Sequence, residues 1–166
     1  MVNLVFWYRI ANWLYLRHVP FIPKLLRLLM FLCYSSSIPP SCKIGKGSFF
    51  NHGGFAILLN SDVVIGRDCK IGNSVSIVGQ GPYKHAPRLG NRVFVGPGAV
   101  IQGPVIIEDG AIIAPNSVVN KSVPSNAVVA GVPAKIIGWA DKLGYDIFKD
   151  EDWKEGFKPF LKSDCI

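Results

Sequence analysis

A six-residue period runs through the middle of this sequence, and it restricts the possible folds more than any other feature. Counting in sixes from Ile65 meets an aliphatic residue at nine of ten positions. The series is Ile65, Ile71, Ile77, Tyr83, Leu89, Val95, Ile101, Ile107, Ile113 and Val119. The residue directly after each member of the series is often glycine or alanine, and the residue four places after each member is mostly small or β-branched. This period fits neither an α-helix nor a meander of β-hairpins.

The period is typical of hexapeptide repeats in a parallel β-helix solenoid. Each aliphatic residue would point inward from a short strand, and the small residue after it would allow a tight corner. Coils would then stack about 4.8 Å apart. A β-sandwich, the alternative, predicts turns about every eight to twelve residues. Ile44 and Phe50 begin an earlier series that is three residues out of phase, and we place the compensating insertion near residues 60–62.

The pattern divides the chain into three parts. Residues 1–37 have apolar residues at helical spacing, and we expect Pro20 and Pro23 to separate two helices. Residues 38–138 form the all-β solenoid. Residues 139–166 are rich in aromatic residues among mixed charges, so we expect a tail that packs on the solenoid or on a neighbouring subunit.

Composition indicates a folded chain with an uneven charge. The sequence is 49% hydrophobic and 17% charged, which excludes an intrinsically disordered protein. Its net charge is +7, and residues 1–61 hold six Lys or Arg and no Asp or Glu. A basic surface attracts phosphates, membranes or nucleic acids, but no motif supports a nucleic-acid partner. The four cysteines lack metal-ligand spacing, and Arg9 and Arg17 interrupt any secretory signal, so we expect a cytoplasmic protein.

Several motifs around the repeat are more specific than the repeat itself. They are residues 38–47 (IPPSCKIGKG), 51–54 (NHGG), 85–90 (HAPRLG) and 131–137 (GVPAKII). Together they resemble the left-handed β-helix acyltransferases, in the branch of the serine O-acetyltransferases and the O-acetyltransferases of bacterial surface-polysaccharide gene clusters. The resemblance covers about residues 38–138. It implies a left-handed parallel β-helix, a homotrimer with active sites between adjacent prisms, and acetyl-CoA as acyl donor without a metal.

Acetyl transfer to a hydroxyl group needs a base for the hydroxyl proton and hydrogen-bond donors for the oxyanion. A neutral imidazole suits the first task. By resemblance His52 is the general base, with Asn51 and Gly53 as candidate substrate contacts and the following glycines leaving space for a substrate. The alternative is a corner histidine that only hydrogen-bonds the backbone. His18 is interpreted as a helix-end residue without a catalytic role.

His85 is the second candidate catalytic residue. It lies in a stretch that interrupts the repeat, and loops that leave a solenoid often carry sites. In the serine enzymes a loop histidine at the matching motif reaches into the neighbouring subunit's site, which implies the same for His85. Tyr83 and Lys84 are then candidate substrate contacts. The alternative is a surface-loop histidine, since the motif here has one more residue between the histidine and the next coil.

The resemblance also places corner residues of consecutive coils along the pantetheine arm of coenzyme A. These are Pro97, Gly98, Ala99 and Pro115, and Lys135 would meet the nucleotide phosphates. The alternative for the glycine and the prolines is ordinary coil geometry. Carbonic anhydrases of the γ class share the fold but need three histidines, and the repeat region has two, so we expect no metal site.

One departure from the serine enzymes bears on the acceptor. Those enzymes carry an Asp fifteen residues before the base, where this chain has Ser37, and no acidic residue precedes Asp62. We therefore expect the acceptor to be a sugar hydroxyl of a surface-polysaccharide precursor. The alternatives are serine, which a terminal Ile166 favours, and a solenoid without catalysis.

The N-terminal helices have two interpretations. They could cap the open end of the solenoid, whose strand edges would otherwise be exposed. They could also make peripheral contact with the inner face of the plasma membrane through residues 1–36, which are aromatic, basic and free of acids. No apolar stretch is long enough for a transmembrane helix.

Overall fold

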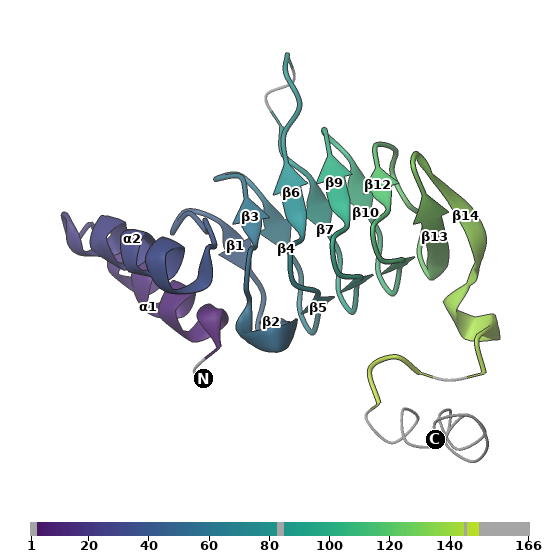
Figure 1. The fold of residues 1–166 in the computed structure, drawn as a ribbon, viewed down its shortest axis with the longest axis horizontal. Helices are drawn as coiled ribbons and strands as arrows, with labels where there is room; N and C mark the ends of the chain where they lie inside the picture. Colours follow the sequence, from purple (N-terminus) through teal and green to yellow (C-terminus); the bar gives the residue numbers. More distant parts are fainter. Residues whose placement is uncertain (1–2, 83–84, 145, 150–166) are drawn as a thin grey trace, which may run out of the picture.

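The computed structural model describes residues 3–82, 85–144 and 146–149. Figure 1 shows a helical hairpin at one end of a triangular prism of short parallel strands, as the six-residue period predicts. Tyr83, Lys84 and residues 150–166 lie outside the described residues.

Three sheets form the faces of the prism, and the chain visits them in turn. Face I contains β1 (Lys43–Ile44), β4 (Val64–Ile65), β7 (Arg88–Leu89) and β10 (Ile106–Ile107). Face II contains β2 (Phe49–Phe50), β5 (Lys70–Ile71), β8 (Phe94–Val95), β11 (Ile112–Ile113) and β13 (Ala127–Gly131). Face III contains β3 (Leu58–Leu59), β6 (Ser76–Val78), β9 (Val100–Gln102) and β12 (Val118–Val119). Neighbours in each of these face lists pair in parallel.

The aliphatic series forms the core of the prism. Each described member of the series is buried, and Ile71, Ile77 and Ile101 are among the largest fully buried side chains. The register pairs inward residues with each other, for example Ile65 with Leu89. The inward assignment of the series is therefore confirmed, apart from Tyr83 in the undescribed gap.

The insertion that shifts the phase of the repeat does not lie near residues 60–62, so that prediction is wrong. The inward residues Ile44 and Phe50 are six apart, but Phe50 and Leu59 are nine apart, and Leu59 and Ile65 are again six apart. The three additional residues therefore belong to the loop between β2 and β3, which carries His52.

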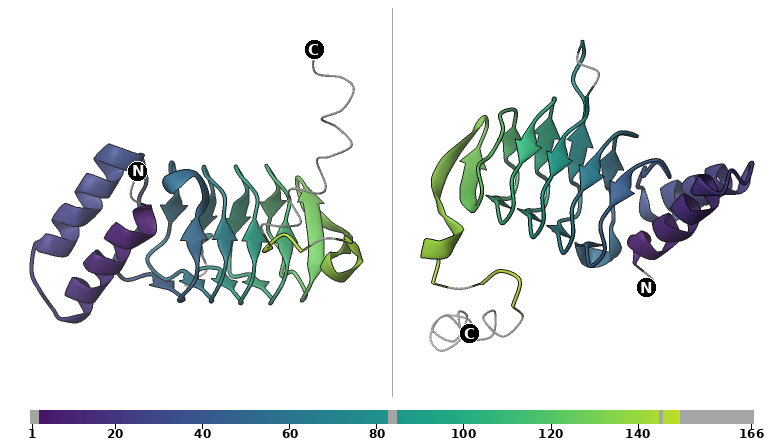
Figure 2. Two further views of the ribbon diagram at one scale, coloured as in Figure 1. Left: turned by 90° about the horizontal axis from the view of Figure 1, so that it is seen from below. Right: turned by 180° about the vertical axis from the view of Figure 1, so that it is seen from behind.

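The N-terminal hairpin covers the first coil. It consists of α1 (Leu4–Leu16) and α2 (Ile22–Tyr34). Pro23 does not separate the helices as predicted but lies in the first turn of α2, where a missing N–H costs nothing. From α1, Tyr8 donates a hydrogen bond to the Cys42 carbonyl (2.6 Å), and burial raises the pKa of this phenol to about 12. These contacts support the capping interpretation (Figure 2).

The opposite end of the prism closes differently. Strand β14 (Ala134–Trp139) turns back and pairs antiparallel with β13. The chain then crosses face II, where Leu143, Ile147 and Phe148 pack against a small cluster. The cluster consists of Phe94, Ile112 and Val128. The described part of the predicted tail therefore packs on its own solenoid.

Candidate functional site

His52 lies on the edge of the prism where the chain passes from face II to face III, which we name the II–III edge. It occupies a single 3-10 turn, Asn51–Gly53, between β2 and β3. Its backbone is left-handed (φ 51°), a conformation in which histidine is tolerated better than most side chains. His52 is exposed and Asn51 is half-buried. The imidazole is therefore accessible to a ligand that lies along this edge.

Two polar side chains hold the His52 loop. Asn3 caps α1 through its side-chain oxygen and donates from its nitrogen to the Phe50 carbonyl (2.7 Å). Ser36, fully buried, accepts from the Ile57 backbone N–H (2.9 Å), and its single hydroxyl proton is shared between the Gly54 carbonyl (2.8 Å) and the Tyr34 carbonyl (2.9 Å). The loop is thus fixed immediately before and after His52. Sequence reasoning gave neither Ser36 nor Asn3 a role.

Gly54 has a different role from the one that the sequence suggests. A Cβ on this residue would come within 2.6 Å of the Leu4 Cβ, and its φ is +89°. Its missing side chain therefore makes room for α1, not for a substrate beside His52. Only glycine combines this φ with this close approach.

Ser37, which occupies the position where the resemblance would place an Asp, contacts a cation. Its hydroxyl accepts a hydrogen bond from Arg27 Nη2 of α2 (3.0 Å). Ser37 also forms an isolated parallel bridge to Leu58 at the start of face III. The described residues that precede Asp62 include no carboxylate that could pair with Arg27 here.

The residues predicted to bind coenzyme A lie on the same edge as His52. Pro97, Gly98 and Ala99 link β8 to β9, and Pro115 lies between β11 and β12. The Ala99 side chain, however, is fully buried in the core, so it is not available to a ligand as the sequence suggested. Backbone hydrogen bonds join these corners from coil to coil. They run from Ser74 N to Phe55 O (3.0 Å), from Gly98 N to Asn73 O (2.9 Å) and from Asn116 N to Pro97 O (2.9 Å).

Lys135 lies at the far end of this series of corners. It lies exposed on β14, opposite Ala130, just after the β13–β14 turn. The turn follows a face II strand, so it continues the II–III edge, and Gly131 N donates to Ser117 Oγ (3.2 Å). Four coil spacings of about 4.8 Å separate the level of β2 from that of β13, about 19 Å in all.

His85 lies on another edge. It precedes β7, where the chain passes from face III to face I, and it is exposed. It borders a polar hollow of about 280 Å³ whose lining includes Lys43, Asp62 and Arg88. Within one chain the two histidines therefore occupy different edges of the prism and are not brought together.

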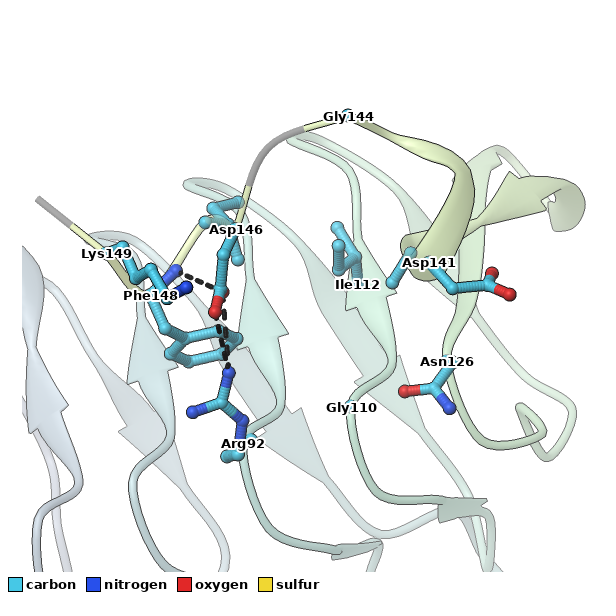
Figure 3. Close-up of a pocket in the computed structure, with 11 residues that line it drawn as sticks. Arg92, Gly110, Ile112, Asn126, Asp141, Gly144, Asp146, Phe148 and Lys149 are labelled. Carbon is cyan, nitrogen blue, oxygen red and sulfur yellow. Dashed lines mark hydrogen bonds and ion pairs between the residues drawn. The ribbon is translucent and has the colours of Figure 1, made fainter. Parts of the chain in front are cut away.

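A larger hollow, of about 470 Å³, lies where the tail crosses face II (Figure 3). Arg92 forms an ion pair with Asp146 (3.1 Å) and lies over the Phe148 ring. The Phe148 backbone N–H, aided by Arg92, lowers the pKa of the Asp146 carboxyl. The lining includes none of the predicted site residues, and among the described residues no group of three or more His, Cys, Asp or Glu could hold a metal.

Comparisons with known proteins agree with this architecture. A model for the bacterial transferase hexapeptide (six repeats) matches residues 86–121. The chain is 36% identical to a serine acetyltransferase of Synechococcus elongatus over 132 residues, covering 78% of this chain and 54% of that protein. It is 34% identical to a serine acetyltransferase of Helicobacter pylori over 138 residues, covering 82% of this chain and 80% of that protein.

Solved structures give the same result. A serine acetyltransferase of Brucella abortus in complex with coenzyme A superposes with a TM-score of 0.77 at 31% identity, covering 81% of this chain and 54% of that one. A serine acetyltransferase of Neisseria gonorrhoeae in complex with serine gives a TM-score of 0.75 at 29% identity, covering 80% and 54%. The left-handed β-helix is thereby confirmed. The chain spans about half the length of several of these relatives.

Proposed function

Because this chain belongs to the hexapeptide-repeat acyltransferase family that includes the serine acetyltransferases, we propose that it transfers an acetyl group from acetyl-CoA to a hydroxyl group. One observation carries the proposal. His52 and the residues predicted to bind coenzyme A share the II–III edge, and backbone hydrogen bonds connect the corners from coil to coil. A base at one end and a cation at the other fit an extended acyl donor that bears phosphates.

The donor fits the chemistry of this edge. The corners between His52 and Lys135 expose backbone groups, proline rings and small polar side chains, which suit the amide-bearing arm of coenzyme A. Lys135 would attract the nucleotide phosphates as a point charge. Bound acetyl-CoA supplies a thioester carbonyl that a hydroxyl oxygen can attack.

His52 would act on the acceptor. Its neutral imidazole takes the proton from the hydroxyl as the oxygen attacks and returns it to the departing thiolate. Asn51 and Gly53 lie beside it as contacts for the acceptor. The hydrogen bonds of Asn3 and Ser36 support this role, because a base must keep a fixed position relative to the reacting oxygen.

The active unit that we propose is a cytoplasmic homotrimer. His85 lies on a different edge from His52, so it can contribute to a His52 site only from a neighbouring prism. Tyr83 and Lys84, in the same loop, would contact the acceptor there. Mixing His52→Ala and His85→Ala chains tests this arrangement: random trimers should regain about one quarter of wild-type activity, whereas sites complete within one chain would give none.

L-Serine is the first candidate acceptor. The named relatives are serine acetyltransferases, and the Neisseria gonorrhoeae structure contains serine. These findings favour serine over the sugar hydroxyl that the sequence alone ranked first.

A sugar hydroxyl is the second candidate, and one observation favours it. An amino-acid acceptor carries an ammonium group, which carboxylates bind well. The described residues before Asp62 offer none, and Ser37 contacts Arg27 instead. This environment suits a neutral or anionic acceptor such as a surface-polysaccharide precursor.

Thiol release from acetyl-CoA tests the activity. We expect His52→Ala to lower kcat by about 10²–10⁴-fold, while the trimer stays intact in gel filtration. His18→Ala is the matched control, since His18 is also exposed and left-handed (φ 57°), and it should keep full activity. Turnover that survives in His52→Ala would refute the mechanism.

The same assay with L-serine and a panel of nucleotide sugars and oligosaccharides identifies the acceptor. Turnover with serine alone would establish the first candidate, and turnover with saccharides alone would establish the second. If no hydroxyl acceptor causes the release of free thiol from acetyl-CoA, that result would contradict the proposed function.

A further inference from the structure

The helical hairpin exposes most of the large apolar side chains on the surface of this protein. Of twenty exposed large hydrophobic residues that the structure describes, twelve lie between Phe6 and Leu32. They are Phe6, Trp7, Trp13, Tyr15, Leu16, Phe21, Ile22, Leu25, Leu28, Leu29, Phe31 and Leu32. Scattered apolar residues are normal on a surface, but this many on one helical hairpin indicate an interaction site.

The outer face of α2 is the clearest part of this group. Leu25, Leu28 and Leu32 recur at helical spacing and are each at least half exposed. They lie opposite the face that buries Pro23 and Met30. Figure 2 shows α2 as the outer helix of the hairpin, with α1 between it and the first coil, so this leucine face points away from the solenoid.

The hairpin carries cations and no acid. Arg9, Arg17, Lys24 and Arg27 are all exposed, and the described residues before Asp62 include no Asp or Glu to neutralise them. Arg17 stacks on the Trp13 ring at 3.8 Å near the turn between the helices, where Phe21 is 80% exposed. Aromatic and basic side chains around an apolar face match the boundary between lipid headgroups and acyl chains.

The helices are too short to cross a bilayer. Each has 13 residues, so each is about 20 Å long, against an apolar bilayer core of about 30 Å. Among the described residues, no helix combines the length and apolar character that a span requires. A helix of this kind is suited to lie in the plane of the interface.

We infer that the leucine face of α2 and the tip of the hairpin dock on an anionic lipid bilayer, with Lys24 and Arg17 at the headgroups. The charge of the surface selects this occupant. A second copy of the hairpin would bring like charges together, whereas an anionic leaflet neutralises them. The inference concerns a surface at the end of the prism and is independent of the acceptor at the His52 site.

Vesicle co-flotation of the full chain tests this inference. We expect binding to phosphatidylcholine vesicles that contain phosphatidylglycerol, and weak binding to phosphatidylcholine alone or at high salt. Leu32→Glu should lower the partition coefficient at least about tenfold. The matched control is Ile137→Glu on β14, because both side chains are 67% exposed and Ile137 lies at the far end of the solenoid, so it should bind like wild type. Lys24→Gln should lower partitioning about fivefold.

Two outcomes would overturn the inference. The first is a wild-type protein that floats with neither kind of vesicle. The second is equal flotation of wild type and Leu32→Glu, with circular dichroism showing both folded. If the wild type binds no vesicle but forms an assembly that Leu32→Glu dissociates, the face is a contact between copies and the lipid inference is wrong.

Discussion

Ser36 offers a sharp test of how the fold positions His52. Its hydroxyl is fully buried and pairs two backbone groups of the His52 loop, the Gly54 carbonyl (2.8 Å) and the Ile57 N–H (2.9 Å). Ser36→Ala leaves both without this partner. An unpaired buried polar group costs about 1–3 kcal/mol, so we expect the free energy of unfolding to fall by about 2–6 kcal/mol for the pair.

The chain contains a matched control. Ser48 is 4% exposed and makes the same two bonds on another edge, to the Gly66 carbonyl (2.7 Å) and from the Cys69 N–H (2.9 Å). Ser48→Ala should therefore lose a similar stability. Only Ser36→Ala loosens the His52 loop, and small displacements of a catalytic group lower rates by up to about 10²-fold.

Urea unfolding followed by circular dichroism gives the two stabilities, and thiol release gives kcat/KM at a temperature where both variants are folded. We expect kcat/KM to fall about 10–100-fold in Ser36→Ala and to stay near wild type in Ser48→Ala. Equal activity in the two variants would refute the argument that Ser36 acts by positioning His52.

Three further predictions follow from the described contacts. An alkylating reagent at pH 8 should label the exposed Cys33 long before Cys42 and Cys69, as mass spectrometry would show, because burial raises the pKa of both buried thiols, that of Cys42 to about 12. Early labelling of a buried thiol would show that the first coils open. Asp146→Asn should lower the free energy of unfolding by less than about 1 kcal/mol at neutral pH, since its ion pair is exposed. The folded state lowers the pKa of the Asp146 carboxyl, so the stability difference from wild type should vanish as the pH falls through that pKa; urea unfolding at several pH values measures it. Lys135→Ala should raise KM for acetyl-CoA about tenfold with little change in kcat, and an unchanged KM would remove this residue from the donor site.

The solenoid could be predicted from the sequence because each coil repeats the same local requirement. In any coil, an aliphatic residue at every sixth position can point inward and fill the core, so Ile71, Ile101 and the other described members are buried as expected. The position of the phase shift could not be predicted in the same way. Phe50 and Ile65 are fifteen residues apart, which equals two repeats and three more residues, and the count alone does not tell which repeat carries them.

The arrangement of the candidate site residues could not be predicted from the six-residue period. Whether two histidines share an edge depends on which face each strand joins, and that became known only from the pairing of strands. Ser36 could have been recognised, because it lies two residues before the buried Ile38 just as Ser48 lies two residues before Phe50. The contact between Arg27 and Ser37 depends on how α2 meets the first coil, for which the sequence carries no periodic signal.

The stacking of coils also makes the protein a molecular ruler. A solenoid gains or loses whole repeats with little effect on the contacts of the others, so an additional coil between β5 and β8 would leave the prism folded. It would nevertheless move Lys135 about 4.8 Å further from His52. An acyl donor has a fixed length, so under the proposed function the donor would limit the number of coils more strictly than stability does.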